Sequence, residues 1–368
     1  MDTQVPSHNA SKELDALLEE YELPSSLGFG KEIAPVMYGA EFCDGRWQRG
    51  QLLPFGDILV NPAATALQFA QQAFEGMKAY QVTQSSPVFF RPEMNFRRLN
   101  RSAERLSMPA LTPEVFAETL TEMAGACQTF IPGKSGQSLY LRPTLIGTDP
   151  SFAVKSSERF SFWLIASPSD AYYGKPIKVM IEREDCRAAV GGTGANKVGG
   201  NYAASLQATQ KCIDAGFDQP IWLDPKSRKN IEELSGMNFI AVIDGILHTP
   251  LLSGSILPGV TRDSLMQLAA QLGIEVVERT MGIDELLDDI SAGRCSELFS
   301  CGTAAIVCPI AAIGESDGTV LKPAYVNRTA KHLKTALLDI QEGRATDTFS
   351  WMADALDREQ LLSRFNES

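Results

Sequence analysis

Apolar stretches of two different periods follow one another along most of the chain. Short runs rich in Val, Ile, Leu and Phe between Gly, Pro and Asp are typical of strands inside a sheet. Longer stretches, whose apolar positions recur every three to four residues, are typical of helices, and two of them end at Gly216 and Gly273. Residues 66–80 fit either a helix start or a strand–turn unit around Gly76. We predict strands within 86–92, 138–148, 159–168, 177–183, 219–224, 238–250 and 298–310, and helices within 93–109, 115–132, 201–216, 261–273 and 326–343.

The order of these elements divides the chain near a segment in which Ser, Asp, Gly and Pro cluster, as they do in linkers. Helices and strands mix on both sides of it without a strict βαβ rhythm. The expected fold class is therefore α/β (mixed α+β), with two α/β domains. We expect a flexible N-terminal arm with one amphipathic turn over 1–25, a small domain over 26–170, a linker over 171–182 and a large domain over 183–368.

Composition and charge exclude several classes of function. The 368 residues are 44% hydrophobic and carry a net charge of −12, which argues against a nucleic-acid or anionic-membrane partner. The seven cysteines form no CxxC pair, and the three histidines are scattered, so we expect reduced thiols in a cytoplasmic protein and no metal. The acidic N-terminus has no apolar signal region, and no apolar run reaches the roughly 20 residues that span a bilayer.

The stretch GGTGANKVGGNYAASL, residues 191–206, places Lys197 at the centre of a glycine-rich loop. A Walker A loop needs Gly before the lysine and Ser or Thr after it, whereas Asn196 and Val198 stand there. A GxGxxG fingerprint also fails, because Lys197 occupies the place of its third glycine. The lysine is therefore either a phosphate contact of another type or a nucleophile.

Three other segments supply groups that a lysine nucleophile would need. A helix that begins near Thr261 would point free N–H groups at an anion, or Thr261 is only the N-cap of that helix. The segment 300–307 is either a loop with further exposed amides or a strand whose small residues pack under a helix. Lysines form Schiff bases with aldehydes, and pyridoxal phosphate is an aldehyde that also carries a phosphate. Its ring nitrogen needs a carboxylate, which Glu232 or Glu233 could provide.

These segments together resemble the branched-chain aminotransferases, which are fold-type IV pyridoxal-phosphate enzymes with the active site at the interface of two α/β domains. The motifs GGTGANKVGGNYAASL, EELSGMN, LPGVTRDSL and CGTAAIVCP occur in the order and at about the spacing of that family. FEGMKAY, FRPEMNFRRLNRSAERL, LYLRPTLIGTDPSFAV and DIQEG extend the resemblance over about residues 29–351. It implies the cofactor pyridoxal 5′-phosphate, a homodimer, and amino acids and 2-oxo acids as small-molecule partners.

The resemblance implies a role for each residue of the cofactor site. Lys197 resembles the lysine that carries the cofactor and moves the proton as general acid and base. Tyr202 resembles the tyrosine that bonds the phenolic oxygen, and Glu233 resembles the pyridinium partner, which leaves Glu232 solvated. Arg97 and Arg98 point to different sides of one helix, and the motif favours Arg98 for the phosphate. The remaining phosphate contacts are Val260, Thr261 and Thr303.

The implied reaction moves the amino group of leucine, isoleucine or valine to 2-oxoglutarate. Tyr140 and Arg142 alternate on one strand, share a face and resemble substrate-recognition residues. The Thr303–Ala304 amides resemble the receptor of the α-carboxylate. The predicted apolar wall is Phe29, Phe74 and Tyr172, and Phe152 and Val154 resemble a loop that reaches the partner subunit.

The chain departs from the family pattern at two places. Phe69 stands where relatives have a tyrosine, which affects substrate preference, and Ala305 stands where some have the first cysteine of a CxxC pair, so that Cys308 alone would form no redox switch. Two rival functions remain at this stage. One is another class IV enzyme, a D-amino-acid transaminase or an aminodeoxychorismate lyase, and the other is a non-catalytic protein that binds a phosphate ligand.

Overall fold

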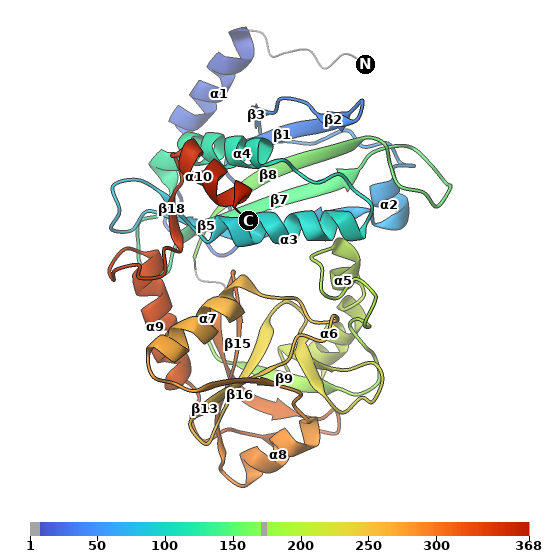
Figure 1. Ribbon diagram of the computed structural model, residues 1–368, viewed down its shortest axis with the longest axis vertical. Coiled ribbons are helices and arrows are strands. Elements are labelled where there is room, and N and C mark those ends of the chain that lie inside the picture. The colour runs from blue at the N-terminus through green and yellow to red at the C-terminus, as the bar shows by residue number, and fades with distance from the viewer. Residues whose placement is uncertain (1–7, 171–174, 368) are drawn as a thin grey trace. The chain divides into compact units, whose positions relative to one another are not determined.

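The computed structural model describes residues 8–170 and 175–367, and the chain divides into two units (Figure 1). Unit 1 comprises residues 1–172 and 341–368, and unit 2 comprises residues 173–340. The C-terminal segment therefore groups with the first unit, whereas the sequence places it in the second domain. The reason is long-range pairing, since β18 (Met352–Asp354) forms an antiparallel pair with β6 (Val88–Phe90).

The predicted arm and linker also contain regular structure. Helix α1 (His8–Glu20) occupies much of the segment expected to be a flexible arm, and it lies against β1 and β3 of unit 1. Strand β9 (Ile177–Glu182) occupies the second half of the expected linker. The amphipathic turn predicted in the arm is thus part of helix α1, and the end of the predicted linker is part of strand β9.

Unit 1 is built on an antiparallel sheet whose main strand order is β18-β6-β5-β7-β8-β1-β2, with β3 beside β1 and β4 beside β7. The long central pair, β7 (Ser138–Gly147) and β8 (Phe160–Ser169), is in register over its whole length. Alternate residues of β7 therefore share a face. The shorter strands are β1 (Val36–Cys43), β2 (Arg46–Trp47), β3 (Gln51–Pro54), β4 (Gln72–Phe74) and β5 (Met77–Tyr80).

Aromatic packing holds the helices of unit 1 together. Phe96 on α3 (Pro92–Arg105) stacks on Phe365 of α10 (Arg358–Asn366) with ring centroids 4.9 Å apart. Phe116 on α4 (Pro113–Cys127) lies 5.4 Å from the Phe365 ring. Burying one such ring contributes about 1.5–3 kcal/mol, which explains why α10 joins unit 1. The remaining helices are α2 (Thr65–Phe69) and the 3₁₀ turn Gln128–Phe130.

Unit 2 contains a sheet that closes on itself. Its strand order is β11-β10-β9-β16-β15-β12, and β11 (Ile231–Leu234) also pairs with β12 (Asn238–Ile243). Strands β13 (Ile246–Pro250) and β14 (Val276–Arg279) extend it beyond β12, and β17 (Val320–Leu321) pairs with β16. All four residues of β11 are buried, including the neighbours Glu232 and Glu233. The other strands are β10 (Gln219–Leu223), β15 (Cys295–Gly302) and β16 (Ile306–Gly314).

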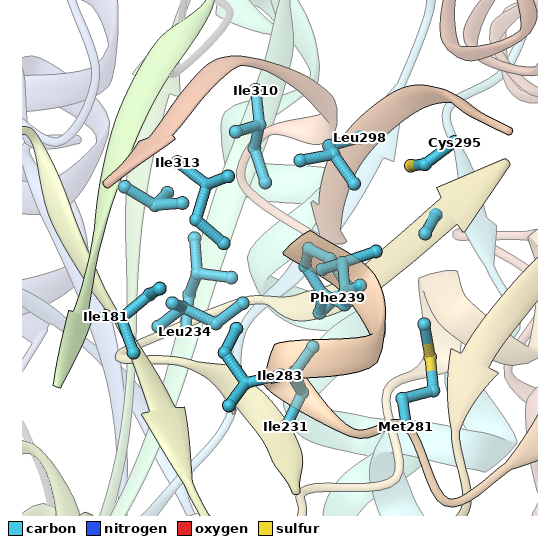
Figure 2. Packing of buried hydrophobic residues seen from close by; sticks show 14 of the residues in the cluster. Ile181, Ile231, Leu234, Phe239, Met281, Ile283, Cys295, Leu298, Ile310 and Ile313 are labelled. Carbon is cyan, nitrogen blue, oxygen red and sulfur yellow. The ribbon is translucent and has the colours of Figure 1, made fainter. Parts of the chain in front are cut away.

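Branched and aromatic side chains fill the centre of this closed sheet. Figure 2 shows Ile181 of β9, Leu234 of β11 and Phe239 of β12 packed with Ile310 and Ile313 of β16, each of them buried. Helix α8 (Ile283–Ser291) adds Ile283 and Leu286 to the same cluster. The predicted helices of unit 2 appear as α5 (Gly199–Ala203), α6 (Leu206–Asp214), α7 (Val260–Gln271) and α9 (Thr329–Gln341), which ends at the start of the C-terminal segment of unit 1.

Candidate active site

Lys197 lies in the loop before α5, and its ammonium group donates a hydrogen bond to the hydroxyl of Tyr202 at 2.6 Å. The same nitrogen lies 4.9 Å from the centre of the Tyr202 ring. Both side chains are half-buried, so they remain reachable by a ligand while being held in one geometry. The structure thus brings together the first two residues that the sequence singled out.

Hydrogen bonds and close packing fix the glycine-rich loop around Lys197. The side-chain amide of Asn201 donates to the carbonyls of Thr193 and Asn196, both at 2.8 Å. The Thr193 hydroxyl donates back to the Asn201 carbonyl oxygen at 2.6 Å. Gly194 has no room for a side chain, because a Cβ there would lie 2.3 Å from the carbonyl oxygen of Ser255. The loop therefore holds the lysine in place.

Glu233 is a buried carboxylate on β11 with three donors around it. It accepts hydrogen bonds from the Leu257 amide at 3.1 Å and from the Asn238 side chain at 3.0 Å. The Arg187 guanidinium lies 2.7 Å from it. Burial raises the pKa of Glu233 to about 7, and the positive charges of Arg187 and Lys197 oppose this increase. A buried acid in this position would favour a further positive charge, such as a protonated ring nitrogen.

Arg187 is a site residue that the sequence did not reveal. Its guanidinium is buried and also donates to the carbonyl oxygens of Gly194, at 3.1 Å, and Ser255. It therefore ties the lysine loop, the Ser255 loop and Glu233 together. An isolated arginine in EDCRAAVGG carries no motif, so no local signal could have found it.

Glu232, the neighbour of Glu233, is buried rather than solvated. Only 3% of it is exposed, and its Oε1 accepts a hydrogen bond from the Ser255 hydroxyl. The expectation of a solvated Glu232 is therefore wrong. It followed from giving the pyridinium role to Glu233 in a polar stretch before an apolar strand, whereas this stretch is itself strand β11 and all four of its residues are buried.

Asn238 joins Glu233 to the segments predicted to bind a phosphate. Its side-chain amide also donates to the Leu257 carbonyl at 2.9 Å. A Cβ on Gly259 would lie 2.0 Å from its side-chain oxygen, so only glycine fits where α7 begins. Asn238 also faces Cys301 across the β12–β15 pair, close to the turn that connects β15 and β16.

The predicted phosphate contacts lie on these segments. Val260 and Thr261 are buried in the first turn of α7, and Gly259 supplies no side-chain cap for the first N–H groups of this helix. A helix N-terminus of this kind stabilises an anion. Thr303 and Ala304 lie half-buried in the turn between β15 and β16.

Arg98 lies on α3 in unit 1 and forms a buried ion pair with Glu75. Its Nε and Nη2 atoms lie 2.6 and 2.9 Å from the two oxygens of that carboxylate. The Asn95 amide donates to Glu75 as well, at 2.8 Å. Arg97 is exposed on another side of the helix, as the helical geometry predicts.

The predicted substrate residues of unit 1 form one cluster around Arg142. Its guanidinium donates to the Tyr140 hydroxyl at 3.1 Å and lies 5.0 Å from the centre of the Phe74 ring. The rings of Phe29 and Tyr140 meet edge to face at 4.9 Å. The cluster combines an apolar wall with a cation that is already paired by a phenol.

Other predicted residues lie outside these two clusters. Phe152 and Val154 are 81% and 90% exposed on the loop between β7 and β8. Phe69 lies at the end of α2 and is partly exposed. Tyr172 lies outside the described residues. Within the described ranges, no group of three or more His, Cys, Asp and Glu side chains is placed to hold a metal ion. No helix described there has both the length and the apolar surface needed to cross a membrane.

Comparison of the chain with known proteins identifies its family and several relatives. The model of the family "Amino-transferase class IV" matches residues 72–313. The chain is 41% identical to the branched-chain-amino-acid aminotransferase of Mycolicibacterium smegmatis, over 94% of this chain and 96% of that protein.

Solved structures that resemble this fold are also branched-chain amino acid aminotransferases. The branched-chain amino acid aminotransferase of Escherichia coli matches with a TM-score of 0.70 and 27% identity, over 86% of this chain and 99% of that one. A second branched-chain amino acid aminotransferase, solved in complex with N-(5′-phosphopyridoxyl)-L-glutamate, matches with a TM-score of 0.67 and 25% identity. The match covers 86% of this chain and 98% of that one.

Proposed function

Because the chain belongs to the amino-transferase class IV family, we propose that it is a pyridoxal-phosphate-dependent branched-chain-amino-acid aminotransferase. The family, the mixed α/β fold, the enzyme class and the cofactor predicted from the motifs are confirmed by these similarities. The reaction reversibly transfers the amino group of L-leucine, L-isoleucine or L-valine to 2-oxoglutarate. The observation that carries the assignment is the Lys197–Tyr202 pair in the same unit as the buried Glu233.

The side chains present in unit 2 fit pyridoxal phosphate. When bound, this group supplies a carbonyl carbon for an amine and a ring that accepts the electrons left at the substrate Cα. Lys197 offers the amine, Tyr202 a hydroxyl for the phenolic oxygen and Glu233 an anion for the ring nitrogen. Val260, Thr261 and Thr303, together with Arg98 of unit 1, are the proposed phosphate contacts.

In the proposed mechanism, Lys197 and Glu233 have separate tasks. The Lys197 amine would hold the carbonyl carbon of the cofactor, and as a free amine it would take the proton from the substrate Cα. The Tyr202 hydroxyl, 2.6 Å away, orients that nitrogen. Glu233 stays ionised when it faces a cationic ring, and Asn238 and Leu257 hold its carboxylate in position.

We propose that the Arg142 cluster selects the substrate. Its apolar rings, Phe29 and Phe74, suit a branched aliphatic side chain, and the Arg142 guanidinium suits the γ-carboxylate of 2-oxoglutarate. With leucine bound, the guanidinium keeps its hydrogen bond to Tyr140 and its contact with Phe74, which lowers the cost of leaving it without a carboxylate. The Thr303–Ala304 amides are the proposed receptor of the α-carboxylate.

We also propose that the enzyme is a homodimer. Leu59, Phe152 and Val154 are each at least 81% exposed, and contact with a second copy of the chain would remove these apolar side chains from water. The loop that carries Phe152 is joined to the start of α2 by a hydrogen bond between the Thr65 and Ser157 hydroxyls at 2.8 Å. Light scattering should give a dimer for the wild type and for Val320→Asp, an exposed valine elsewhere, but a monomer for Val154→Asp. A monomeric wild type would exclude the proposal.

We propose that the protein resides in the cytoplasm, a reducing compartment in which cysteines stay unpaired. All seven cysteines are free in the structure. Cysteines of secreted proteins are mostly paired in disulfides.

Two measurements test the proposed function. Borohydride reduction of the cofactor-loaded protein, followed by peptide mass mapping, should locate the cofactor on Lys197, and Lys197→Ala should have no transaminase activity. Lys211→Ala, which removes an exposed lysine of α6, should retain full activity. Turnover of L-leucine, L-isoleucine and L-valine with 2-oxoglutarate, but not of D-amino acids, would distinguish this enzyme from the other class IV activities. A cofactor attached elsewhere, or none, would refute the assignment.

A further inference from the structure

A cavity of about 520 Å³ lies in unit 2, and its lining includes residues of β11, the strand that also carries Glu233. Its volume falls within the range of ordinary small-molecule sites, about 300–1,000 Å³. Neither Lys197 nor Tyr202 nor Glu233 lines it. The lining residues that matter here are Lys226, Glu232, Pro250, Leu251, Ser253 and Ile256.

Glu232 is the unusual member of this lining. Its Oε2 atom is buried and has no hydrogen-bond partner among the described residues, although the Ser255 hydroxyl donates to its Oε1. Burial raises the pKa of Glu232, and the Ser255 hydrogen bond and the positive charge of Arg187 offset this increase only in part. A buried acceptor without a partner is destabilising unless something occupies it.

The lining also contains one further acidic residue and one basic residue. Asp224 also lines the cavity, but backbone amides and the Ser227 hydroxyl already donate to its carboxylate. Lys226 is exposed at the cavity and provides one cation for a carboxylate. Pro250, Leu251 and Ile256 provide an apolar wall between these charges.

A short chain of hydrogen bonds links this cavity to Glu233. Ser253, which lines the cavity, shares a hydrogen bond of 2.7 Å with the Ser255 hydroxyl, and that hydroxyl donates to Glu232. The Ser255 carbonyl accepts from Arg187, and Arg187 pairs with Glu233 at 2.7 Å. A ligand that moves Glu232 or Ser255 therefore changes the surroundings of the carboxylate that faces the cofactor ring.

We propose that this cavity is a regulatory site for a small aliphatic α-amino acid, with the ammonium group on Glu232, the side chain on the Leu251 wall and the carboxylate on Lys226. Binding itself is independent of the proposed function, whereas its effect on Glu233 rests on it. Occupation adds a cation beside Glu232 and thereby alters the Ser255–Arg187–Glu233 connection. The ligand class is the same as that of the substrates, so the site would sense their concentration.

The test measures binding where catalysis is blocked. Borohydride-reduced holoenzyme cannot exchange its cofactor carbonyl, and its binding of L-leucine can be followed by titration calorimetry. Leu251→Trp fills the cavity, and Glu232→Gln removes the anion while keeping a hydrogen bond to Ser255. The matched control is Leu272→Trp, which changes an exposed leucine at the end of α7.

We expect both cavity variants to weaken one class of L-leucine binding by about tenfold or more, as the loss of a charged contact predicts, and Leu272→Trp to leave it unchanged. Crystals of the reduced enzyme soaked in L-leucine should show the amino acid beside Glu232. Unchanged binding in Leu251→Trp, or leucine found only beside Lys197, would overturn the proposal. If borohydride fixes no cofactor on Lys197, the proposed function fails instead, and the same titration on the untreated chain still decides whether the cavity binds L-leucine.

Discussion

Replacing Arg187 by methionine tests whether one buried cation holds the cofactor site together. The substitution keeps a side chain of similar length and removes the charge that lies 2.7 Å from Glu233. It also removes the donor to the carbonyls of Gly194 and Ser255. Glu233 would remain buried with Asn238 and Leu257 as its only described donors.

The expected magnitude follows from the burial of both partners. Their side chains are 5% and 4% exposed, so the pair is a buried one. Removing one partner of such a pair costs about 3–5 kcal/mol, because the other is left charged and desolvated. Each 1.4 kcal/mol is about a tenfold change in an equilibrium, so local opening of unit 2 should become at least about a hundredfold more frequent.

Hydrogen–deuterium exchange of the cofactor-free protein measures this change separately in each unit. Peptides of β9–β12 should lose protection in Arg187→Met, while peptides of β7 and β8 in unit 1 serve as an internal reference. Arg183→Met is the matched control, since Arg183 forms an exposed pair with Glu315 that contributes about 1 kcal/mol or less. The double variant Arg187→Met/Glu233→Gln should recover part of the loss, because no unpaired charge is left.

The pH dependence of this loss has a definite sign. Burial already raises the pKa of Glu233, and removing Arg187 raises it further. A carboxylate whose pKa is raised in the folded state destabilises that state as pH rises from the unfolded pKa to the folded pKa. The cost of Arg187→Met should therefore be smaller under mildly acidic conditions and larger under alkaline ones. A loss below about tenfold in protection, or double-variant energies that simply add within about 0.5 kcal/mol, would refute the reasoning.

Two further predictions concern the lysine loop and the thiols. Gly194→Ala should lower both the melting temperature and the cofactor affinity, because its Cβ would lie 2.3 Å from the Ser255 carbonyl oxygen. Gly200→Ala should be tolerated, because among the described residues a Cβ there would meet no atom within 4 Å beyond its own helix and chain neighbours. Equal shifts of the two variants in differential scanning fluorimetry would contradict the clash. Iodoacetamide should label the exposed Cys186 first and Cys308 only after unfolding. Cys308 is buried, and burial raises the pKa of its thiol to about 11. Equal labelling rates of the two cysteines in the native protein, measured by peptide mass mapping, would contradict this prediction.

Local pattern and motif order predicted much of the candidate cofactor site. Lys197 and Tyr202 are recognisable because loop and helix follow one another directly in the sequence. Helical geometry shows that Arg97 and Arg98 point to different sides, and the family motif favours Arg98. The C-terminal strand β18 was not predicted, because its partner β6 lies more than 250 residues earlier and no local pattern records such a pairing.

The missed site residues share one physical property. Arg187, Glu232 and Asn238 act by bridging segments that are distant in the sequence, and their side chains are ordinary in composition and spacing. Alternation predicts one exposed residue of two neighbours on a strand only when the sheet has a free face. The closed sheet of unit 2 removes that free face at β11, so Glu232 is buried, whereas the family resemblance, which gives the pyridinium role to Glu233, implies a solvated Glu232.

The same bridging explains why glycines surround the lysine. If they served mobility, the loop would need few contacts, but Asn201 ties it at two carbonyls and Gly194 presses against Ser255. The glycine at 194 instead lets the backbone approach Ser255 closely enough for Arg187 to donate to both carbonyls. The lysine is thus fixed relative to Glu233 through the backbone, and a base held in this way loses little entropy when it reacts.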